Sequence, residues 1–288
     1  AGSGSRTGNI EALHPGANDN ASGTAGLLEL AQKLSSNKSR LKRSVLLVGF
    51  DAEEKGLLGS KYFVENPTVK LTNIISMINM DMIGGIKDST VNIGGVGTSP
   101  AFRPLLDSLK TVYPLKFSMS TQGFGPSDHA SFYSKDIPVL FFFSGFHDEY
   151  HTPEDTWKNI NLKGEKDLLN LIYDVIYNIS RANTPPVFSK AGAQTRPGST
   201  NMGLRVTLGI MPSYNSTDEG LEIDDISKKD GPAARTGMKK GDVIKSINQK
   251  PVKNIYEYMD RLGELKKGMV VPVGIERNGK TLTLSVTF

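Results

Sequence analysis

Two adjacent glutamates, Glu53 and Glu54, follow directly on the apolar run VLLVGF at residues 45–50. Neighbouring carboxylates repel each other, and a turn after a buried strand is a poor place to concentrate negative charge. A solvated turn would explain the pair, and so would a site where one carboxylate binds a cation and the other accepts a proton. The remaining acidic and imidazole side chains decide between these two readings.

Side chains of the same chemical kinds occur where other predicted strands end and in the Gly-rich loop HPGANDNASG. In an open α/β sheet, ligands bind at the carboxyl ends of the strands. The residues at these positions are Asp19, Asp51, Glu53, Glu54, Asp81, His147, Tyr150 and His151. Carboxylates converging on one rim would repel strongly unless a positive charge lay among them. Carboxylates with imidazole and without thiolate predict a divalent metal site, with zinc as the leading candidate.

The elements that must position these residues alternate between strand and helix. Short continuous apolar runs, typical of strands buried on both faces, occur at 45–50, 73–81 and 137–143. Apolar residues at helical spacing predict helices at 22–34, 56–66, 99–112 and 166–180. This alternation predicts an α/β fold over residues 1–182, with a mainly parallel sheet sandwiched by helices.

The composition changes at residues 183–200, where Pro, Gly, Ser and Thr predominate and predict a linker. Beyond it, residues 201–288 predict a small β-rich domain with two short helices, near 232–237 and 254–264. Its strands are predicted at 204–211, 221–226, 242–248, 270–276 and 281–287.

The composition and net charge of the 288 residues exclude several kinds of site and partner. The formal net charge is +4 and no dense basic stripe occurs, so a nucleic-acid partner is not expected. The absence of cysteine excludes disulfides, thiolate metal ligands and a Cys nucleophile. No apolar run is long enough to predict a membrane span.

Five motifs, in this order and at this spacing, resemble the co-catalytic di-zinc aminopeptidases, the family of secreted bacterial leucyl-type aminopeptidases. They are GANDNASGTAGLLELA, FDAEEKGLLGS, NMDMIG, SDHASF and YHTPEDT, and they fall within residues 14–180. The resemblance implies a zinc-exopeptidase fold, two Zn²⁺ ions in the complete enzyme, and removal of N-terminal, apolar residues from peptide substrates. It also implies a secreted or periplasmic location.

The resemblance implies a metal-binding role for four residues. Asp19 is similar to the carboxylate that bridges the two metals, and the peptide bond between Asp19 and Asn20 is expected to be cis. Glu54 and His151 are similar to ligands of one metal. Asp81 is similar to a ligand of the other.

Two further residues match catalytic positions of the family. Glu53 is similar to the general base, which takes a proton from the metal-polarised water and delivers it to the leaving amine. Tyr150 is similar to a tyrosine that stabilises the tetrahedral intermediate. We therefore expect the carboxylate of Glu54 to bind a metal and that of Glu53 to face the water.

Other residues near the motifs have less specific expectations. His129 is expected to shape the substrate rim or to form a local hydrogen bond, and His147 to be a loop residue. Asp128 and Asp155 are candidates to support the metal ligands or to cap loops. Four apolar residues could line a pocket or pack in the core: Met82, Phe124, Phe132 and Phe146.

The C-terminal region resembles a PDZ domain. Within RVTLGI (205–210), the triplet Leu208-Gly209-Ile210 is similar to the loop that binds a carboxylate. PDZ domains add an extended peptide to a sheet edge, and backbone N–H groups hold its terminal carboxylate. A peptide C-terminus in this groove is therefore one possible partner, and a groove filled internally or used only as a spacer is the other.

The family pattern also has a histidine in a His-x-Asp context upstream of the Asp19 loop. None of the four histidines stands in that context, and His14 lies within the loop itself. We therefore expect the chain to lack an N-terminal portion with one ligand and several strands, which would then be a partner. One metal site would keep only Asp19 and Asp81, whereas the other, with Asp19, Glu54 and His151, would be complete.

Two other functions stay open on sequence alone. A glutaminyl-cyclase-like enzyme on the same fold would use a similar set of Asp, Glu-Glu and His residues. A catalytically inactive scaffold built on the PDZ module is the other alternative. Intact Glu53, Glu54, Asp81 and His151 argue against the inactive scaffold.

Overall fold

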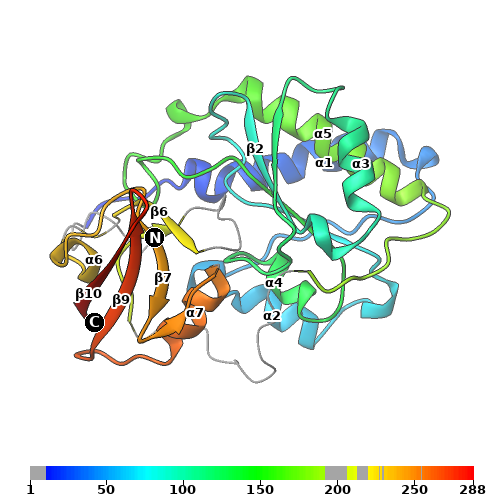
Figure 1. Cartoon of the computed structure of the whole chain (residues 1–288). Coiled ribbons are helices and arrows are strands. Elements are labelled where there is room, and N and C mark those ends of the chain that lie inside the picture. Colours follow the sequence, from blue (N-terminus) through cyan, green and yellow to red (C-terminus); the bar gives the residue numbers. More distant parts are fainter. Residues whose placement is uncertain (1–10, 192–205, 213–219, 227, 229, 254) are drawn as a thin grey trace. The chain divides into compact units, whose positions relative to one another are not determined.

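A computed structural model describes residues 11–191, 206–212, 220–226, 228, 230–253 and 255–288 (Figure 1). The chain divides into two compact units, Ala1–Gly192 and Ala193–Phe288. Half of the predicted linker, residues 192–200, lies outside the described residues, as do residues 1–10.

The first unit is built on a sheet with the strand order β1-β4-β2-β3. Strand β1 (Met77–Met80) runs parallel to β4 (Val139–Phe143), and β2 (Thr90–Gly94) runs parallel to β3 (Lys116–Met119). Strands β2 and β4 are antiparallel. Two of the three pairings between these described strands are parallel, which confirms the predicted α/β class.

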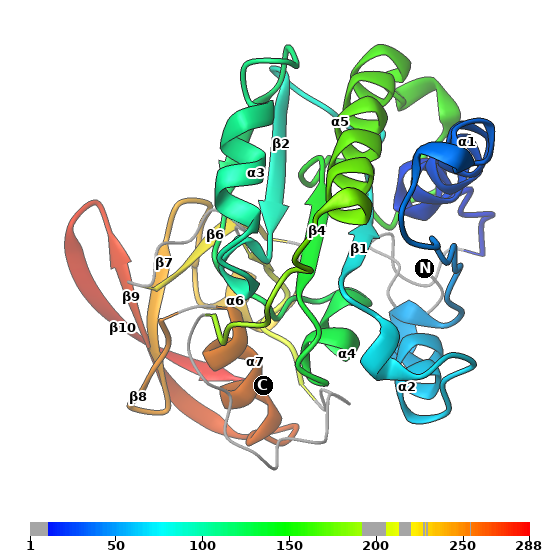
Figure 2. The same ribbon diagram turned by 90° about the vertical axis from the view of Figure 1, so that its right-hand side faces the viewer.

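Helices cover the sheet on both faces. Helices α1 (Gly23–Ser36) and α3 (Phe102–Leu109) contact the long helix α5 (Leu162–Arg181), which runs beside the strands in Figure 2. Helix α2 (Leu58–Glu65) contacts α4 (His129–Tyr133), which lies against β1 and β4. Short helical turns complete the unit: Ala17–Ser22, Lys38–Arg40, Glu53–Lys55, Leu71–Asn73, Val96–Thr98 and Trp157–Asn159.

Strand β4 shows why its sequence is apolar throughout. Leu140 and Phe142 pack in the larger core cluster, among residues of α1, α3 and α5. Val139 packs in a second cluster with Val64 of α2 and Phe132 of α4. Successive side chains of a strand point to opposite faces, so a strand between two helical layers must be apolar at every position.

The predicted strand at 45–50 is wrong. These residues pair with no described strand, and Leu46 and Leu47 are 55% and 37% exposed. An apolar run predicts burial, but a strand also needs a neighbour for its backbone hydrogen bonds. The first unit also contains two strands and one α-helix that were not predicted, β2, β3 and α4.

The second unit is a β-rich domain with the strand order β10-β9-β7-β6-β5, in which β8 pairs with β7. The predicted strands from 221 onward and both predicted helices are confirmed. The first predicted strand, 204–211, is wrong over residues 206–210, which form no strand, and its residues 204 and 205 lie outside the described residues. The elements are β5 (Met211–Pro212), β6 (Leu221–Asp225), α6 (Pro232–Arg235), β7 (Val243–Ile247), β8 (Lys250–Pro251), α7 (Ile255–Gly263), β9 (Val270–Arg277) and β10 (Lys280–Thr287).

An ion pair between the buried Asp242 and the half-buried Arg277 joins two parts of the second unit. Asp242, which is 1% exposed, binds Arg277 through two contacts, 2.6 Å from Oδ1 to Nε and 2.7 Å from Oδ2 to Nη2. Asp242 Oδ2 also accepts the N–H of Lys239 at 2.8 Å. The pair ties the turn before β7 to the end of β9.

None of the helices in the described part of the chain is long and apolar enough to cross a membrane.

Candidate metal centre

Asp19 lies in the turn before α1, and side chains tie this turn to the end of β1. Asn20 Nδ2 donates to the carbonyl of Met80 at 3.1 Å, and Asn20 Oδ1 accepts the N–H of Met82 at 3.1 Å. The Asp19–Asn20 peptide bond is cis, as the resemblance implies. These contacts place Asp19 beside the strand end that carries Asp81.

Glu53 and Glu54 lie in a tightly closed turn that precedes α2. Ala52 has a positive φ of 54°, and the N–H of Gly59 donates to the carbonyl of Asp51 at 2.9 Å. A Cβ at Gly59 would lie 2.5 Å from that carbonyl oxygen, so only glycine allows the chain to close here. The closed turn presents both glutamates from one short segment.

Asp19, Glu54 and His151 converge although they come from distant parts of the sequence. His151 Nε2 lies 3.0 Å from Asp19 Oδ2 and 2.7 Å from Glu54 Oε1. One ligand atom from each residue lies within 4.8 Å of the other two. Among the described residues, this is the group of three or more His, Cys, Asp or Glu side chains able to hold a metal ion.

Asp81 lies outside this group of three and is held by its own hydrogen bonds. Ser127 Oγ donates to Asp81 Oδ2 at 2.7 Å, and Asn79 Nδ2 donates to Ser127 Oγ at 2.7 Å. Because the amide occupies Ser127 as an acceptor, the hydroxyl hydrogen is directed at Asp81. Ser127 therefore fixes one carboxylate oxygen of Asp81, Oδ2.

The carboxylates of the site act strongly on one another. The pKa of Glu53 is raised to about 9, mainly by burial. The negative charges of four neighbouring carboxylates raise the pKa of Glu53 further: Asp81, Glu54, Asp128 and Asp19. Burial and the charge of Asp19 likewise raise the pKa of Asp81 to about 7, against the lowering effect of its hydrogen bond from Ser127. Glu53 and Asp81 therefore share the negative field of the three-residue group.

The pKa values of His151 and Glu54 shift in the directions expected for an ion pair between these two side chains. Burial alone would lower the pKa of His151, but its hydrogen bonds to Asp19 and Glu54 raise it to about 9. Burial alone would raise the pKa of Glu54, but the hydrogen bond and charge of His151 lower it. An imidazolium thus lies between two carboxylates, at the place where a cation would bind.

Tyr150 lies against the imidazole of His151. The two rings stack with centroids 3.8 Å apart and planes at 23°. The ring of Phe146 also contacts that of Tyr150, edge to face, with centroids 4.9 Å apart. Tyr150 therefore lies next to the three-residue group, and the role of its hydroxyl stays a prediction.

The remaining histidines lie apart from this group. His129 is 1% exposed, stacks on Phe141, and contacts Asn79 at 3.4 Å, which confirms the expected local hydrogen bond. Burial lowers the pKa of His129 to about 3, so the ring is neutral. His14 Nδ1 lies 2.9 Å from the carbonyl of Ala12 and joins no metal-binding group. The expected core packing is found for Met82 and Phe132, each 3% exposed.

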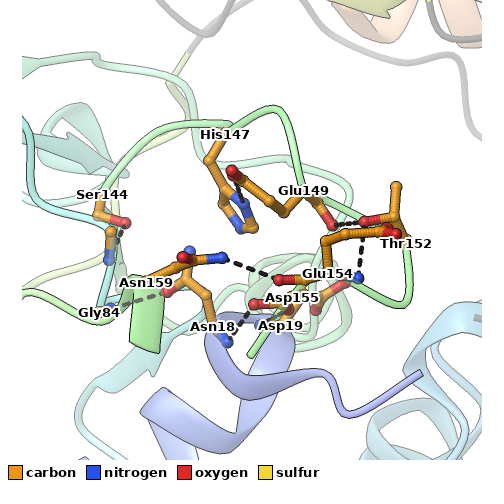
Figure 3. A network of polar contacts seen from close by, with 11 residues as sticks. Asn18, Asp19, Gly84, Ser144, His147, Glu149, Thr152, Glu154, Asp155 and Asn159 are labelled. Atoms are coloured by element: carbon orange, nitrogen blue, oxygen red, sulfur yellow. Dashed lines mark hydrogen bonds and ion pairs between the residues drawn. The ribbon is translucent and has the colours of Figure 1, made fainter. Parts of the chain in front are cut away.

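Asp155 has a contact that sequence reasoning did not specify. Its two carboxylate oxygens accept the N–H groups of Asn18 and Asp19, at 2.9 and 3.0 Å (Figure 3). Asn20 and Ser127 were also missed as supports of the expected ligands. Asn20 lies within GANDNASGTAGLLELA and Ser127 within SDHASF, so their presence in these motifs was the available signal.

Comparison with known families agrees with this geometry. The model of peptidase family M28 matches residues 5–176. The chain belongs to peptidase family M28. A PDZ-domain model matches residues 206–288, so the second unit is a PDZ domain. The sequence resemblance to this class of peptidases is confirmed.

Relatives of this M28 chain include named peptidases. Aminopeptidase YwaD of Bacillus subtilis is 31% identical over 182 residues, which are 60% of this chain and 39% of that protein. Leupeptin-inactivating enzyme 1 of Streptomyces exfoliatus is 34% identical over 131 residues, 45% of this chain and 29% of that protein. This chain thus spans less than half the length of these two relatives.

A solved structure supports the M28 fold. The LapA aminopeptidase of Legionella pneumophila aligns with a TM-score of 0.54 and 24% identity, over 61% of this chain and 49% of that one. At this identity the likeness shows the shared fold of the first unit.

Proposed function

We propose that this chain is a zinc-dependent aminopeptidase that removes N-terminal, apolar residues from peptides. The observation that carries the proposal is the convergence of Asp19, Glu54 and His151 on one position, with Glu53 in the same negative field. Membership of peptidase family M28 supports peptide hydrolysis as the reaction class.

The residues present fit a bound zinc ion. Two carboxylates and an imidazole are a donor set that zinc accepts. Burial is the largest cause of the raised pKa values of Glu53 and Asp81, and the negative charges of neighbouring carboxylates add to it; a cation would offset this second part. We propose that Asp19, Glu54 and His151 hold one ion, and that Asp19 and Asp81 contribute to a second.

Glu53 is proposed as the general base. When bound, zinc supplies a Lewis acid that polarises the scissile carbonyl and acidifies a water molecule. Glu53 takes the proton of the attacking water and delivers it to the leaving amine. A base must be ionised to accept a proton, and a nearby cation lowers the pKa of Glu53 from its value of about 9.

Tyr150 is proposed to donate its hydroxyl to the oxyanion that develops on the scissile carbonyl. A donor aimed at developing charge is worth a few kcal/mol in an active site, roughly 2.7–4 for one hydrogen bond. The position of the Tyr150 ring against His151 supports this role.

The resemblance to secreted bacterial aminopeptidases supports a secreted or periplasmic location.

The PDZ domain is proposed to bind the C-terminus of a peptide. Gly209 has a φ of 76°, and a Cβ there would lie 3.0 Å from the Cβ of Lys228, so the loop depends on glycine. The N–H of Gly209 donates to Thr207 Oγ1 at 3.0 Å. A peptide carboxylate would therefore have to displace the Thr207 hydroxyl from this amide.

The test is a metal count on the full chain together with a panel of amino-acid p-nitroanilides. We expect the leucine derivative to be among the fastest, and we expect chelation to abolish turnover and added zinc to restore it. A parallel assay follows cyclisation of a glutaminyl peptide. Cyclisation without p-nitroanilide hydrolysis would establish the glutaminyl-cyclase alternative, and zinc-loaded protein inactive in both assays would contradict an enzymatic function.

A further inference from the structure

Asp155 holds three consecutive amides of the loop that carries Asp19. Its carboxylate accepts the N–H groups of Asn18 at 2.9 Å and Asp19 at 3.0 Å. Its backbone carbonyl accepts the N–H of Ala17 at 3.1 Å. Asp155 is 1% exposed, so water does not compete for these bonds. Figure 3 shows its carboxylate directed at the backbone of the Asp19 turn.

The segment that carries Asp155 is itself closed by hydrogen bonds. Thr152 Oγ1 donates to the carbonyl of Glu149 at 2.7 Å and accepts the N–H of Glu154 at 3.3 Å. Asn159 Nδ2 donates to the carbonyl of Glu154 at 2.8 Å. His151 lies inside this closed segment. The segment therefore presents His151 and Asp155 with a fixed spacing.

We propose that Asp155 is a positioning residue that sets the orientation of Asp19. Residues 151–155 would then supply one metal ligand directly, His151, and fix a second one, Asp19, through its backbone. The inference rests on the proposed zinc site. It adds a residue that binds no metal and yet controls how well the metal is bound.

Residue 155 must offer two acceptor atoms to hold both the Asn18 and the Asp19 amides. An ionised carboxylate offers two oxygens and no donor, which matches two adjacent N–H groups. An asparagine offers one oxygen and an NH₂ group, which would face a second donor. Asp155→Asn therefore loses one bond to the turn and places two donors together. Losing a group that orients a metal ligand typically costs about 10–100-fold in metal affinity.

The experiment compares Asp155→Asn with Glu154→Gln in the full chain. Glu154 is the exposed neighbour, so the control makes the same carboxylate-to-amide change one residue away. Zinc affinity is measured by competition with a chelating dye, and the visible spectrum of the Co²⁺-substituted protein reports ligand geometry. We expect Asp155→Asn to weaken zinc binding about 10–100-fold and to change the Co²⁺ spectrum. Glu154→Gln should match the wild type in both measurements.

A double variant tests whether Asp155 acts through Asp19. In an Asp19→Asn background, Asp155→Asn should change zinc affinity less than twofold, because the ligand that it orients is already lost. Additive effects of the two substitutions, or wild-type zinc affinity in Asp155→Asn, would overturn the inference. Wild-type chain that binds no zinc would instead contradict the proposed function.

Thr152→Val keeps the inference testable if Asp155→Asn does not fold. This substitution preserves shape and removes the hydroxyl that joins Glu149 to Glu154. We expect zinc binding to weaken a fewfold, about 2–5-fold, because one support of the segment is lost. Unchanged zinc affinity in folded Thr152→Val would count against the proposal.

Discussion

Glu53→Gln should stabilise the metal-free protein, and by an amount that grows with pH. The pKa of Glu53 is raised from 4.5 to about 9 in the folded state, with burial as the largest cause. Between these two values the folded protein holds a proton that the unfolded chain releases. The free energy of unfolding therefore falls as pH rises through this window. Glutamine has no proton to lose, so the variant escapes this penalty.

The size of the expected stabilisation by Glu53→Gln follows from the pKa shift of Glu53. Each pH unit above 4.5 costs about 1.4 kcal/mol while the folded carboxyl stays protonated, which gives an upper limit of about 3 kcal/mol at pH 7. Relaxation of the site reduces this limit, so we expect roughly 1–3 kcal/mol. For a unit of this size that corresponds to an increase of about 2–10 °C in the Tm.

The assay is a series of thermal melts in EDTA between pH 4.5 and pH 8, which follow the transition of the first unit. The Tm difference between Glu53→Gln and wild type should be near zero at the acid end and should grow toward neutral pH. Glu54→Gln is the matched control, because His151 lowers the pKa of Glu54 against the effect of burial. That variant should lose stability at neutral pH.

A Tm difference that stays constant across this pH range would refute the reasoning. With zinc present, Glu53→Gln should keep its metal while turnover falls by about 10²–10⁴-fold, the usual worth of a general base. Glu54→Gln should instead bind zinc more weakly. Loss of zinc from Glu53→Gln but not from Glu54→Gln would reverse the two roles.

Three further outcomes test the rest of the architecture. Deletion of residues 201–288 should leave hydrolysis of small p-nitroanilides within about threefold of wild type, because the proposed catalytic residues all precede residue 157; a folded, zinc-loaded but inactive product would show that the PDZ domain completes the site. Asp242→Asn should lower the urea midpoint of the PDZ domain, since the ion pair with Arg277 is lost; a midpoint equal to that of the wild type would contradict this. Thr207→Val should free the Gly209 amide and strengthen binding of an N-acetylated peptide acid about threefold or more, but not of the matching peptide amide, in polarisation measurements with metal-free protein; equal changes for acid and amide would show that this amide does not meet the carboxylate.

The proposed ligand residues could be named from sequence because each stands in a motif of the family. Asp19, Glu54 and His151 are far apart along the chain; their position at predicted strand ends and in the Gly-rich loop indicated that they meet, and the family resemblance indicated which of them would bind metal. Asp155 belongs to the same motif as His151, but its role depends on which amides face it in the folded chain. No local pattern contains that information, because the two partners are separated by 136 and 137 residues.

The strands show a different limit of prediction from sequence. Strand β4 was predicted because both of its faces are buried, which makes its whole sequence apolar. Strand β2 alternates between buried and half-buried positions over five residues, a signal too short to separate from a loop. The run at 45–50 has the composition of a buried strand but pairs with no described strand. Composition reports a preference for burial, whereas pairing depends on which other segments lie alongside.

The placement of His151 between two carboxylates has a consequence for how the site exchanges its cation. With a pKa of about 9, the imidazole carries a proton at neutral pH, and this proton serves as the counter-ion of Asp19 and Glu54. A histidine must give up that proton before its nitrogen can bind a metal. In the proposed zinc site a proton and a zinc ion would therefore compete for one position, and zinc uptake would exchange one cation for another. Asp19 and Glu54 would have a positive counter-charge before and after this exchange, which would keep the three proposed ligands close together.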